Sequence, residues 1–148
     1  MRIALASDEP YAVHAVVEAD LERRGHSVKR FGSLASGSEC PWALVAEEAA
    51  LSIARGECDE GVFFCWTGTG ISIAANKVPG IRAALCGDAA TASAARVWNH
   101  ANVLCLSNRT LSPDVAREIL AAWFDTPPGE KGSEGARLCD EVDQRNRG

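Results

Sequence analysis

Gly61-Val-Phe-Phe-Cys65-Trp-Thr-Gly-Thr-Gly70-Ile-Ser-Ile-Ala-Ala-Asn-Lys77 is the stretch of sequence that decides the fold. Val62, Phe63 and Phe64 are β-branched and aromatic residues without polar alternation, which predicts a strand buried on both faces in a parallel sheet. The strand ends at Cys65, where a Gly-rich loop begins, and a helical pattern follows the loop. Because open α/β sheets bind ligands outside the carboxyl ends of their strands, we expect Cys65 to face a ligand.

The loop that follows the strand has the composition of an anion-binding turn. Gly68 and Gly70 allow the backbone to turn so that several N–H groups point one way at the start of the next helix. Thr67, Thr69 and Ser72 add hydroxyls, and the amides from Gly68 to Ser72 suit an oxyanion such as an enediolate or a phosphate oxygen. The loop lacks the G-K-[ST] ending and the complete dinucleotide fingerprint, which argues against a nucleotide site.

Outside this stretch, short β-like runs alternate with longer helical runs. The expected strands are Arg2-Ala6, Ser27-Phe31, Gly61-Phe64, Ile81-Leu85 and Asn102-Leu106. The expected helices are Tyr11-Arg24, Pro41-Arg55, Ile71-Lys77, Ala89-Trp98 and Pro113-Trp123. This alternation predicts an α/β fold, a three-layer α/β/α sandwich with a Rossmann-like, five-stranded parallel sheet. Pro10, Pro41 and Pro113 are expected in first helical turns, and Gly25 and Gly56 are expected where helices stop.

Length and composition indicate one globular domain. The 148 residues fit a single domain that buries about two-thirds of its unfolded surface. Residues 126–148 change to a linker and a charged C-terminal helix, which we expect to pack on a partner subunit. The net charge of -5 offers no basic face for nucleic acid. No run approaches the roughly 20 apolar residues of a membrane span, and the N-terminus turns acidic too early for a signal peptide, so a cytoplasmic location is expected.

Cysteines, histidines and aromatic residues are expected to be mostly structural. The six cysteines form no C-x-x-C pair and the three histidines form no H-E-x-x-H motif, so we expect neither disulfides nor a metal. Trp42 and Trp123 recur with apolar residues at helical spacing, which predicts that both lie in the core. Ser112, before Pro113, is expected to cap its helix.

Asp8 ends the first expected strand as Cys65 ends the third, so a doubly wound sheet brings both to one edge. A purely structural interpretation makes Asp8 the N-cap of a helix starting at Pro10, which does not exclude a catalytic role. The corresponding interpretation of Cys65 is another buried thiol. Its place at the start of a helix favours a reactive cysteine instead.

The segment from Cys65 to Cys86, CWTGTGISIAANKVPGIRAALC, closely resembles the signature of the ribose-5-phosphate isomerase B and galactose-6-phosphate isomerase family. The resemblance covers nearly the whole chain and includes Asp8, the Asn-Val-Leu run at 102–104, Ser107-x-Arg109 and an Arg-bearing C-terminal helix. It implies an α/β/α sandwich that forms a homodimer or a dimer of dimers, with active sites shared between subunits. It also implies an aldose–ketose isomerisation of a sugar or sugar phosphate through a cis-enediolate, without a cofactor.

The same resemblance implies a role for each matching residue. Cys65 is the base that moves the proton between C1 and C2, and Thr67 assists proton transfer between the oxygens. Asp8 binds substrate hydroxyls, and the amides from Gly68 to Ser72, which include Gly70, stabilise the enediolate.

The chain departs from the family pattern on one side of the expected pocket. The family has a phosphate-binding histidine where this chain has Glu9, and a glycine where it has Trp66. The histidine that opens the furanose ring aligns with Trp98, although the neighbouring Asn99 is kept. His100 is one residue further along and is expected to face elsewhere.

The phosphate clamp is also incomplete. One of its two arginines aligns with Ser133, whereas Arg137 is kept, and Lys131 is near enough in sequence to substitute in part. Together with Arg109, these residues are the cations that remain for an anion.

An intact loop beside a changed pocket predicts retained chemistry on a different substrate. We therefore expect an isomerase of a sugar or sugar phosphate other than ribose 5-phosphate, and a smaller or open-chain substrate is the simplest account. Two alternatives stay open: a non-catalytic or partner-dependent subunit, and an ordinary ribose-5-phosphate isomerase.

Overall fold

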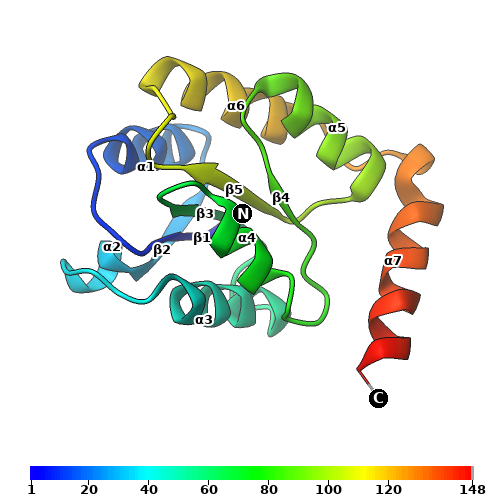
Figure 1. The fold of residues 1–148 in the computed structure, drawn as a ribbon. Coiled ribbons are helices and arrows are strands. Elements are labelled where there is room, and N and C mark those ends of the chain that lie inside the picture. Colours follow the sequence, from blue (N-terminus) through cyan, green and yellow to red (C-terminus); the bar gives the residue numbers. More distant parts are fainter. Residues whose placement is uncertain (148) are drawn as a thin grey trace.

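The computed structural model describes residues 1–147 and contains one parallel sheet of five strands in the order β2-β1-β3-β5-β4 (Figure 1). The strands are β1 (Arg2–Ser7), β2 (Ser27–Gly32), β3 (Glu60–Cys65), β4 (Ala83–Leu85) and β5 (Val103–Ser107). The helices are α1 (Val13–Arg23), α2 (Ser33–Ser36), α3 (Trp42–Ala54), α4 (Thr69–Ala75), α5 (Ala89–Asn99), α6 (Pro113–Asp125) and α7 (Ser133–Asn146), with a 3₁₀ turn η1 (Glu130–Gly132). Within residues 1–147, no helix combines the length and apolarity needed to cross a bilayer.

Helices cover both faces of the sheet, as the alternating pattern predicts. One apolar cluster joins the sheet to α1, α5 and α6, and a second joins the other face to α3 and α4 (Figure 1). In β3, Val62 and Phe64 belong to the first cluster, whereas Phe63 and Cys65 belong to the second. The unbroken apolar run of β3 is therefore buried on both faces, and the α/β/α prediction is confirmed.

The order of the strands creates a crevice at one edge of the sheet. β1 and β3 are neighbours, with Ser7 opposite Phe64, and β5 lies beyond β3, with Ser107 opposite Cys65. The chain leaves β1 toward α1 on one face and leaves β3 toward α4 on the other. Ligand sites of open α/β folds lie at such a switch point, outside the carboxyl ends of the strands.

The first helix starts later than the sequence predicts. α1 begins at Val13 after Ala12, and no side chain caps it, so the prediction that Pro10 lies in a first turn is wrong. The alternative interpretation of Asp8 as a helix cap is excluded as well. The intervening residues form a turn in which the His14 amide donates to the Tyr11 carbonyl oxygen at 3.1 Å, and this turn leads the chain from the sheet edge onto its face.

The other predicted helix boundaries hold more closely. Ser112 caps α6 by accepting the Val115 amide at 3.2 Å, with Pro113 in the first turn as predicted. Pro41 occupies the N-cap position of α3, one residue before the predicted first turn. The two short elements α2 and η1 were not predicted.

The two tryptophans expected in the core differ. Trp123 is fully buried, and its indole N–H donates to Glu60 at 2.9 Å, as a buried indole requires. Trp42 is 45% exposed, so its predicted place in the core is wrong. It occupies the first position of α3, at the end of the helix that reaches the sheet edge.

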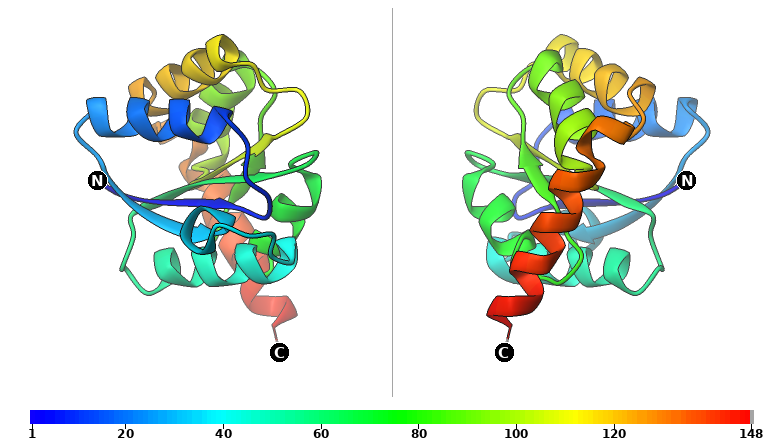
Figure 2. Two further views of the ribbon diagram at one scale, coloured as in Figure 1. Left: turned by 90° about the vertical axis from the view of Figure 1, so that its left-hand side faces the viewer. Right: turned by 90° about the vertical axis from the view of Figure 1, so that its right-hand side faces the viewer.

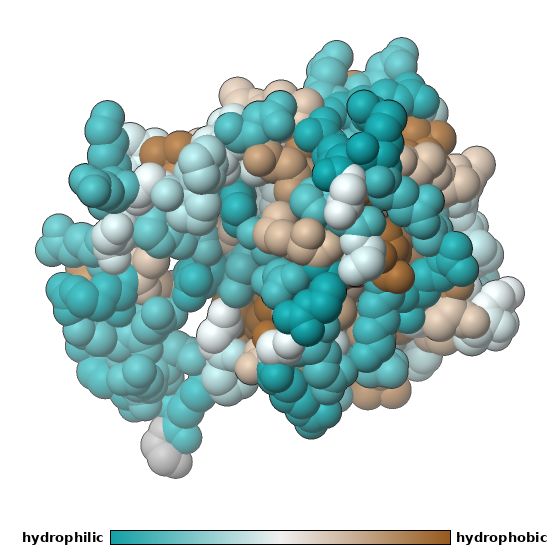
Figure 3. Space-filling model, turned by 180° about the vertical axis from the view of Figure 1, so that it is seen from behind, coloured by the Kyte–Doolittle hydropathy of each residue, from teal (hydrophilic) through white to brown (hydrophobic). Residues whose placement is uncertain are grey.

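The expected C-terminal helix is present as α7, which begins at Ser133. α7 contacts α5 and η1 of the same chain and runs along the β4 side of the molecule past both helical layers (Figure 2). Its lower part has a hydrophilic surface (Figure 3), and Arg147 donates to the Lys77 carbonyl oxygen at 3.1 Å. Leu138 and Val142 are nearly half exposed. Packing against a partner subunit remains a prediction, and residue 148 lies outside the described residues.

Candidate active site

Cys65 is the last residue of β3 and is 5% exposed at the crevice between β1 and β3. Its carbonyl oxygen accepts the backbone amide of Asn108 at 2.9 Å. The next carbonyl, that of Trp66, accepts the Arg109 amide at 3.0 Å and the Ser107 hydroxyl at 2.9 Å. Three hydrogen bonds therefore fix the loop after β3 to the loop after β5.

Gly68 closes this loop at a position that only glycine fits. Its φ is 77°, in the left-handed region, and it is the residue before the first turn of α4. A Cβ atom there would lie 2.5 Å from Leu85 Cδ1 and 3.0 Å from the backbone carbon of Leu106. Both the backbone conformation and the close packing on β5 therefore require glycine.

The hydroxyls of the loop interact with each other at the start of α4. The Oγ1 atoms of Thr67 and Thr69 lie 2.6 Å apart. Ser72 donates its hydroxyl to the Thr69 carbonyl at 2.8 Å and its amide to the Gly68 carbonyl at 3.3 Å, so both donors of Ser72 are already used. The amides of Gly70 and Ile71 precede the first i→i−4 bond of α4, as helix geometry requires.

Trp42 covers the other side of α4. A Cβ atom on Gly70 would lie 3.1 to 3.3 Å from three atoms of the Trp42 indole, so the glycine allows the ring to lie close to the helix. Sequence reasoning missed this position. The signal for it was Pro41-Trp42, which places a large aromatic residue at the start of a helix rather than in its middle.

Asp8 lies directly after β1, level with Cys65 on the adjacent strand. It is 7% exposed, and its Oδ1 atom has no hydrogen-bond partner. Burial, together with the neighbouring charge of Glu9, raises the pKa of the Asp8 carboxyl. An unpartnered carboxyl group at this edge is able to accept or donate a hydrogen bond to a hydroxylated ligand.

Glu9, Tyr11 and Trp66 form a wall beside Asp8. The Tyr11 hydroxyl donates to Glu9 Oε2 at 2.7 Å, and this hydrogen bond raises the pKa of Tyr11 to about 12. The Tyr11 ring lies 5.9 Å from the Trp66 ring between centroids, tilted by 33°. Glu9 and Trp66 are therefore close in space, as expected for two substrate-binding candidates, and Tyr11 joins them.

Arg109 lies on the far side of the loop from this wall. Together with Thr67, it lines a cavity of about 240 Å³ that also contains Ser107. In this cavity the Arg109 cation and the Thr67 hydroxyl lie at the end of β5.

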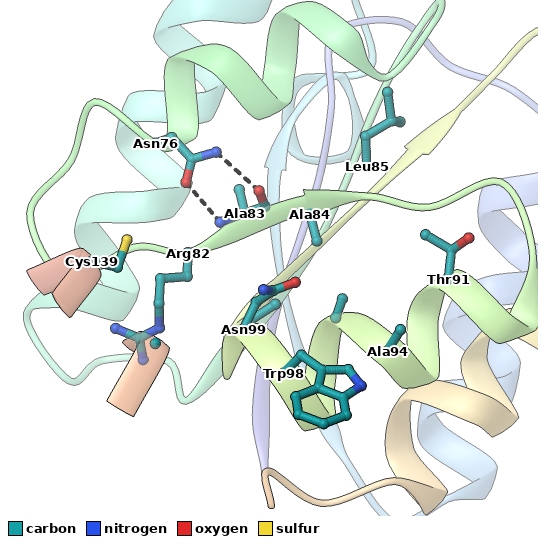
Figure 4. A pocket seen from close by; sticks show the side chains of 13 residues that line it. Asn76, Arg82, Ala83, Ala84, Leu85, Thr91, Ala94, Trp98, Asn99 and Cys139 are labelled. Atoms are coloured by element: carbon teal, nitrogen blue, oxygen red, sulfur yellow. Dashed lines mark hydrogen bonds between the residues drawn. The ribbon is translucent and has the colours of Figure 1, made fainter. Parts of the chain in front are cut away.

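Trp98 and Asn99 belong to a different place in the chain. They line a cavity of about 540 Å³ between β4, α5 and α7, where Asn99 points toward β4 (Figure 4). Arg96, two residues earlier in α5, pairs with Glu60, the first residue of β3. Trp98 and Asn99 therefore lie near the amino end of β3, whereas Cys65 lies at its carboxyl end.

The remaining cationic candidates, Lys131 and Arg137, belong to η1 and α7. The Lys131 ammonium lies 6.0 Å from the centroid of the Trp98 ring. Arg137 forms an ion pair with Glu141 one turn further along α7. Within one chain, these residues and Cys65 are not brought together.

His100 ends α5 in a left-handed conformation with φ of 49°. Its Nε2 atom lies 2.7 Å from the carbonyl oxygen of Gly129. The ring holds the segment before η1, and this agrees with the expectation that His100 faces away from the position of Trp98.

Three further residues at the crevice were missed by sequence reasoning: His14, Asn108 and Ser7. His14 is 2% exposed, and burial lowers its pKa. Its Nε2 atom lies 2.7 Å from Asn108 Oδ1, and Asn108 Nδ2 donates to the Ser7 hydroxyl at 3.3 Å. Ser7 and Asn108 come at the ends of β1 and β5, so the rule that located Asp8 and Cys65 also applied to them.

Comparisons with known proteins agree with this geometry. Residues 3–141 match the model of the Ribose/Galactose Isomerase family. The chain is 32% identical to Ribose-5-P isomerase B of Listeria innocua over 149 residues, covering 99% of this chain and 100% of that protein. It is 39% identical to D-erythrulose-4-phosphate isomerase of Pectobacterium atrosepticum over 105 residues, covering 71% of this chain and 69% of that protein.

The fold comparison is equally extensive. A solved structure of ribose-5-phosphate isomerase B from Clostridium thermocellum matches with a TM-score of 0.90 and 34% identity, covering 98% of this chain and 99% of that one. The chain therefore belongs to the ribose/galactose isomerase family and is an isomerase of that family.

Proposed function

We propose that the chain is a cofactor-independent aldose–ketose isomerase that works through a cis-enediolate with Cys65 as its base. The observation that carries this proposal is the position of Cys65 at the switch point of the sheet, beside the Thr67–Thr69 hydroxyl pair at 2.6 Å. A base and a hydroxyl relay side by side are what a 1,2 proton transfer needs.

Each step of the reaction has a group suited to it. The Cys65 thiolate removes the proton from C2 of the aldose and returns it to C1, while Thr67 moves a proton between the O1 and O2 oxygens. The charge of the intermediate lies on its oxygens, and the amides of Gly70 and Ile71 at the start of α4 are the donors we assign to it. Asp8 accepts hydrogen bonds from hydroxyls further along the carbon chain of the substrate.

The substrate we propose is an open-chain sugar, with four carbons as the best fit. Trp98 stands where the family has a ring-opening histidine, and His100 is occupied with the Gly129 carbonyl at 2.7 Å. A four-carbon sugar phosphate cannot form a furanose through its phosphorylated terminal oxygen, so it needs no ring-opening residue. The similarity to a D-erythrulose-4-phosphate isomerase supports this choice.

The complete site is proposed to form between two copies of the chain. Trp98, Asn99, Lys131 and Arg137 are candidates for substrate binding, yet the Arg96–Glu60 pair places this part of α5 at the opposite end of β3 from Cys65. In a homodimer, the α5–α7 region of one copy supplies these residues to the Cys65 crevice of the other.

The test is an isomerisation assay on a panel of tetrose, pentose and hexose sugars and their phosphates. We expect turnover of D-erythrulose 4-phosphate or D-erythrulose, and a loss of at least about a thousandfold in Cys65→Ala. Cys58→Ala is the matched control, since Cys58 is a buried thiol near the other end of the same strand. No turnover of any sugar by the wild type would contradict the proposal, as would full activity in Cys65→Ala.

Ribose-5-phosphate isomerase activity is the second candidate, because the Listeria innocua relative of that name matches over its whole length. Turnover of ribose 5-phosphate as fast as that of any tetrose would favour it. A role as a partner-dependent subunit predicts instead that the purified chain alone catalyses nothing until a homologous subunit is added.

A further inference from the structure

Five residues at the crevice are joined in a closed ring of hydrogen bonds: Ser7, Glu9, Tyr11, His14 and Asn108. The Ser7 hydroxyl donates to the Glu9 carbonyl at 2.7 Å and accepts Asn108 Nδ2 at 3.3 Å. Asn108 Oδ1 lies 2.7 Å from His14 Nε2, and His14 Nδ1 lies 3.3 Å from the Tyr11 amide. The Tyr11 hydroxyl donates to Glu9 Oε2 at 2.7 Å and so closes the ring of hydrogen bonds.

The directions of these bonds set the state of His14. The Tyr11 amide can only donate, so His14 Nδ1 accepts and carries no proton. His14 Nε2 therefore carries the proton and donates to Asn108, and the imidazole is neutral. Burial lowers the pKa of His14, which agrees with this neutral form.

Glu9 is fixed at both its backbone and its side chain by this ring. One carboxylate oxygen accepts the Tyr11 hydroxyl, which leaves the other oxygen with acceptor capacity. Among residues 1–147, no lysine or arginine forms an ion pair with Glu9. Its negative charge is therefore held in place without a neutralising partner.

The position of that charge is at the catalytic crevice. Glu9 follows Asp8, and the Tyr11 ring that holds Glu9 packs against Trp66, the residue after Cys65. The side chain of Glu9 is partly exposed, so it is accessible to a bound molecule. The charge of Glu9 also acts on its neighbours, because it contributes to the raised pKa of both Asp8 and Tyr11.

We infer that Glu9, held by Tyr11 in this ring, is a specificity-determining residue that rejects a phosphate group and accepts a sugar hydroxyl at its end of the site. This inference rests on the proposed isomerase function and narrows its substrate. A fixed, unneutralised carboxylate repels a phosphate dianion. The carboxylate oxygen that Tyr11 does not use accepts a hydrogen bond from a sugar hydroxyl. The substrate therefore presents an uncharged hydroxyl to Glu9, and any anionic group of the substrate lies away from it.

The binding of inorganic phosphate tests the repulsion without any turnover. Calorimetric titration is expected to show phosphate binding about tenfold tighter in Glu9→Gln than in the wild type, because one nearby negative charge is removed. Glu118→Gln, on the exposed face of α6, loses the same charge elsewhere and is expected to bind phosphate as the wild type does. Equal phosphate affinity in the wild type and Glu9→Gln would overturn the inference.

The ionisation of Tyr11, the one tyrosine of the chain, tests the ring of hydrogen bonds. Ultraviolet titration is expected to show a phenol with a pKa of about 12 in the wild type and a lower pKa in Glu9→Gln, because the hydrogen bond to Glu9 is the largest cause of the raised pKa. Titration of Tyr11 near its ordinary pKa in the wild type would show that Tyr11 does not hold Glu9, and would overturn the inference.

Substrate preference separates this inference from the proposed function. The ratio of kcat/KM for D-erythrulose 4-phosphate to that for D-erythrulose is expected to rise about tenfold in Glu9→Gln. An unchanged ratio would contradict the role of Glu9 while leaving the isomerase proposal intact. If no sugar of the whole panel reacts, the isomerase proposal fails, and the phosphate and Tyr11 measurements still decide whether Glu9 repels an anion.

Discussion

At the scale of single residues, Asp8 lowers the stability of the folded protein at the candidate site. Its carboxyl is 7% exposed, has an unpartnered Oδ1 atom and has a raised pKa because of burial and then of Glu9. A carboxyl whose pKa is raised by folding lowers stability as the pH rises from its ordinary 3.8 through the raised value, because the folded protein holds that charge less easily.

Asp8→Asn is therefore expected to be more stable than the wild type at pH 7, and the difference is expected to vanish near pH 4. It is also expected to lose activity, since the amide cannot replace the carboxylate as an acceptor for substrate hydroxyls. Urea unfolding between pH 4 and pH 8 measures the difference. A less stable Asp8→Asn at pH 7 would mean that the charged carboxylate is satisfied in the folded protein.

Gly68 gives a second prediction at this scale. Gly68→Ala is expected to lose more than about 3 kcal/mol of stability and most of its activity, because a left-handed φ and a clash with Leu106 combine. Gly25→Ala is the control, since Gly25 has a φ of 86° with no atom within 4 Å of the added Cβ. It is expected to cost only about 1 kcal/mol and to keep full activity. Similar losses in the two variants would contradict the packing argument.

The loop after β3 was predictable from sequence, whereas the hydrogen-bonded residues beside it were not. Cys65, Thr67 and Gly68 follow one another after a buried strand, so local pattern alone places them. Asn108 meets His14 and Ser7 only because β1 and β5 both lie beside β3 in the sheet, and spacing along the chain contains no such information.

At the scale of elements, a buried network fixes α5 and α6 to the amino end of β3. Arg96 pairs with Glu60 at 2.8 Å, donates to the Ala101 carbonyl at 2.7 Å and lies 4.9 Å from the Trp123 ring centroid. Trp123 also donates to Glu60, so one carboxylate serves both helices.

Arg96→Met is expected to lower the free energy of unfolding by about 3–5 kcal/mol, because it leaves the buried Glu60 carboxylate without its cation. The double variant Arg96→Met, Glu60→Gln is expected to recover a substantial part of that loss. Urea denaturation of the three proteins measures the coupling. A single variant as stable as the wild type would show that Glu60 is satisfied without Arg96.

The strands and helices were largely predictable because their hydrophobic periods are clear. The start of α1 was not, since Asp8 and Pro10 have the residue types of a helix start while the chain uses those positions to pass from the sheet edge onto its face. Trp42 has helical spacing, yet its position at the first turn of α3 exposes it. Tertiary position overrides the local pattern in both cases.

At the scale of the whole molecule, the candidate site residues fall into two groups at opposite ends of the sheet. One group surrounds Cys65, and the other surrounds Trp98 near the end of α5. The two groups meet only if a second copy of the chain supplies one of them.

Subunit mixing tests this arrangement. Two proteins are mixed: the Cys65→Ala variant and a double variant that carries both Asn99→Ala and Arg137→Ala. Homodimers of each variant alone are expected to be inactive. After the subunits exchange at random, half of the dimers contain one intact site, so about a quarter of the wild-type activity is expected to return. No recovery, despite exchange shown by native mass spectrometry, would place each complete site within one chain.

Solvent deuterium exchange tests the central claim, that Cys65 moves a proton on a sugar carbon, most directly. D-erythrulose 4-phosphate and D-erythrulose are incubated with the protein in D₂O, and NMR follows deuterium entering the carbons between which the proton moves. We predict exchange with the wild type and with Cys58→Ala, and none above background with folded Cys65→Ala. Exchange by Cys65→Ala at the wild-type rate would contradict the account.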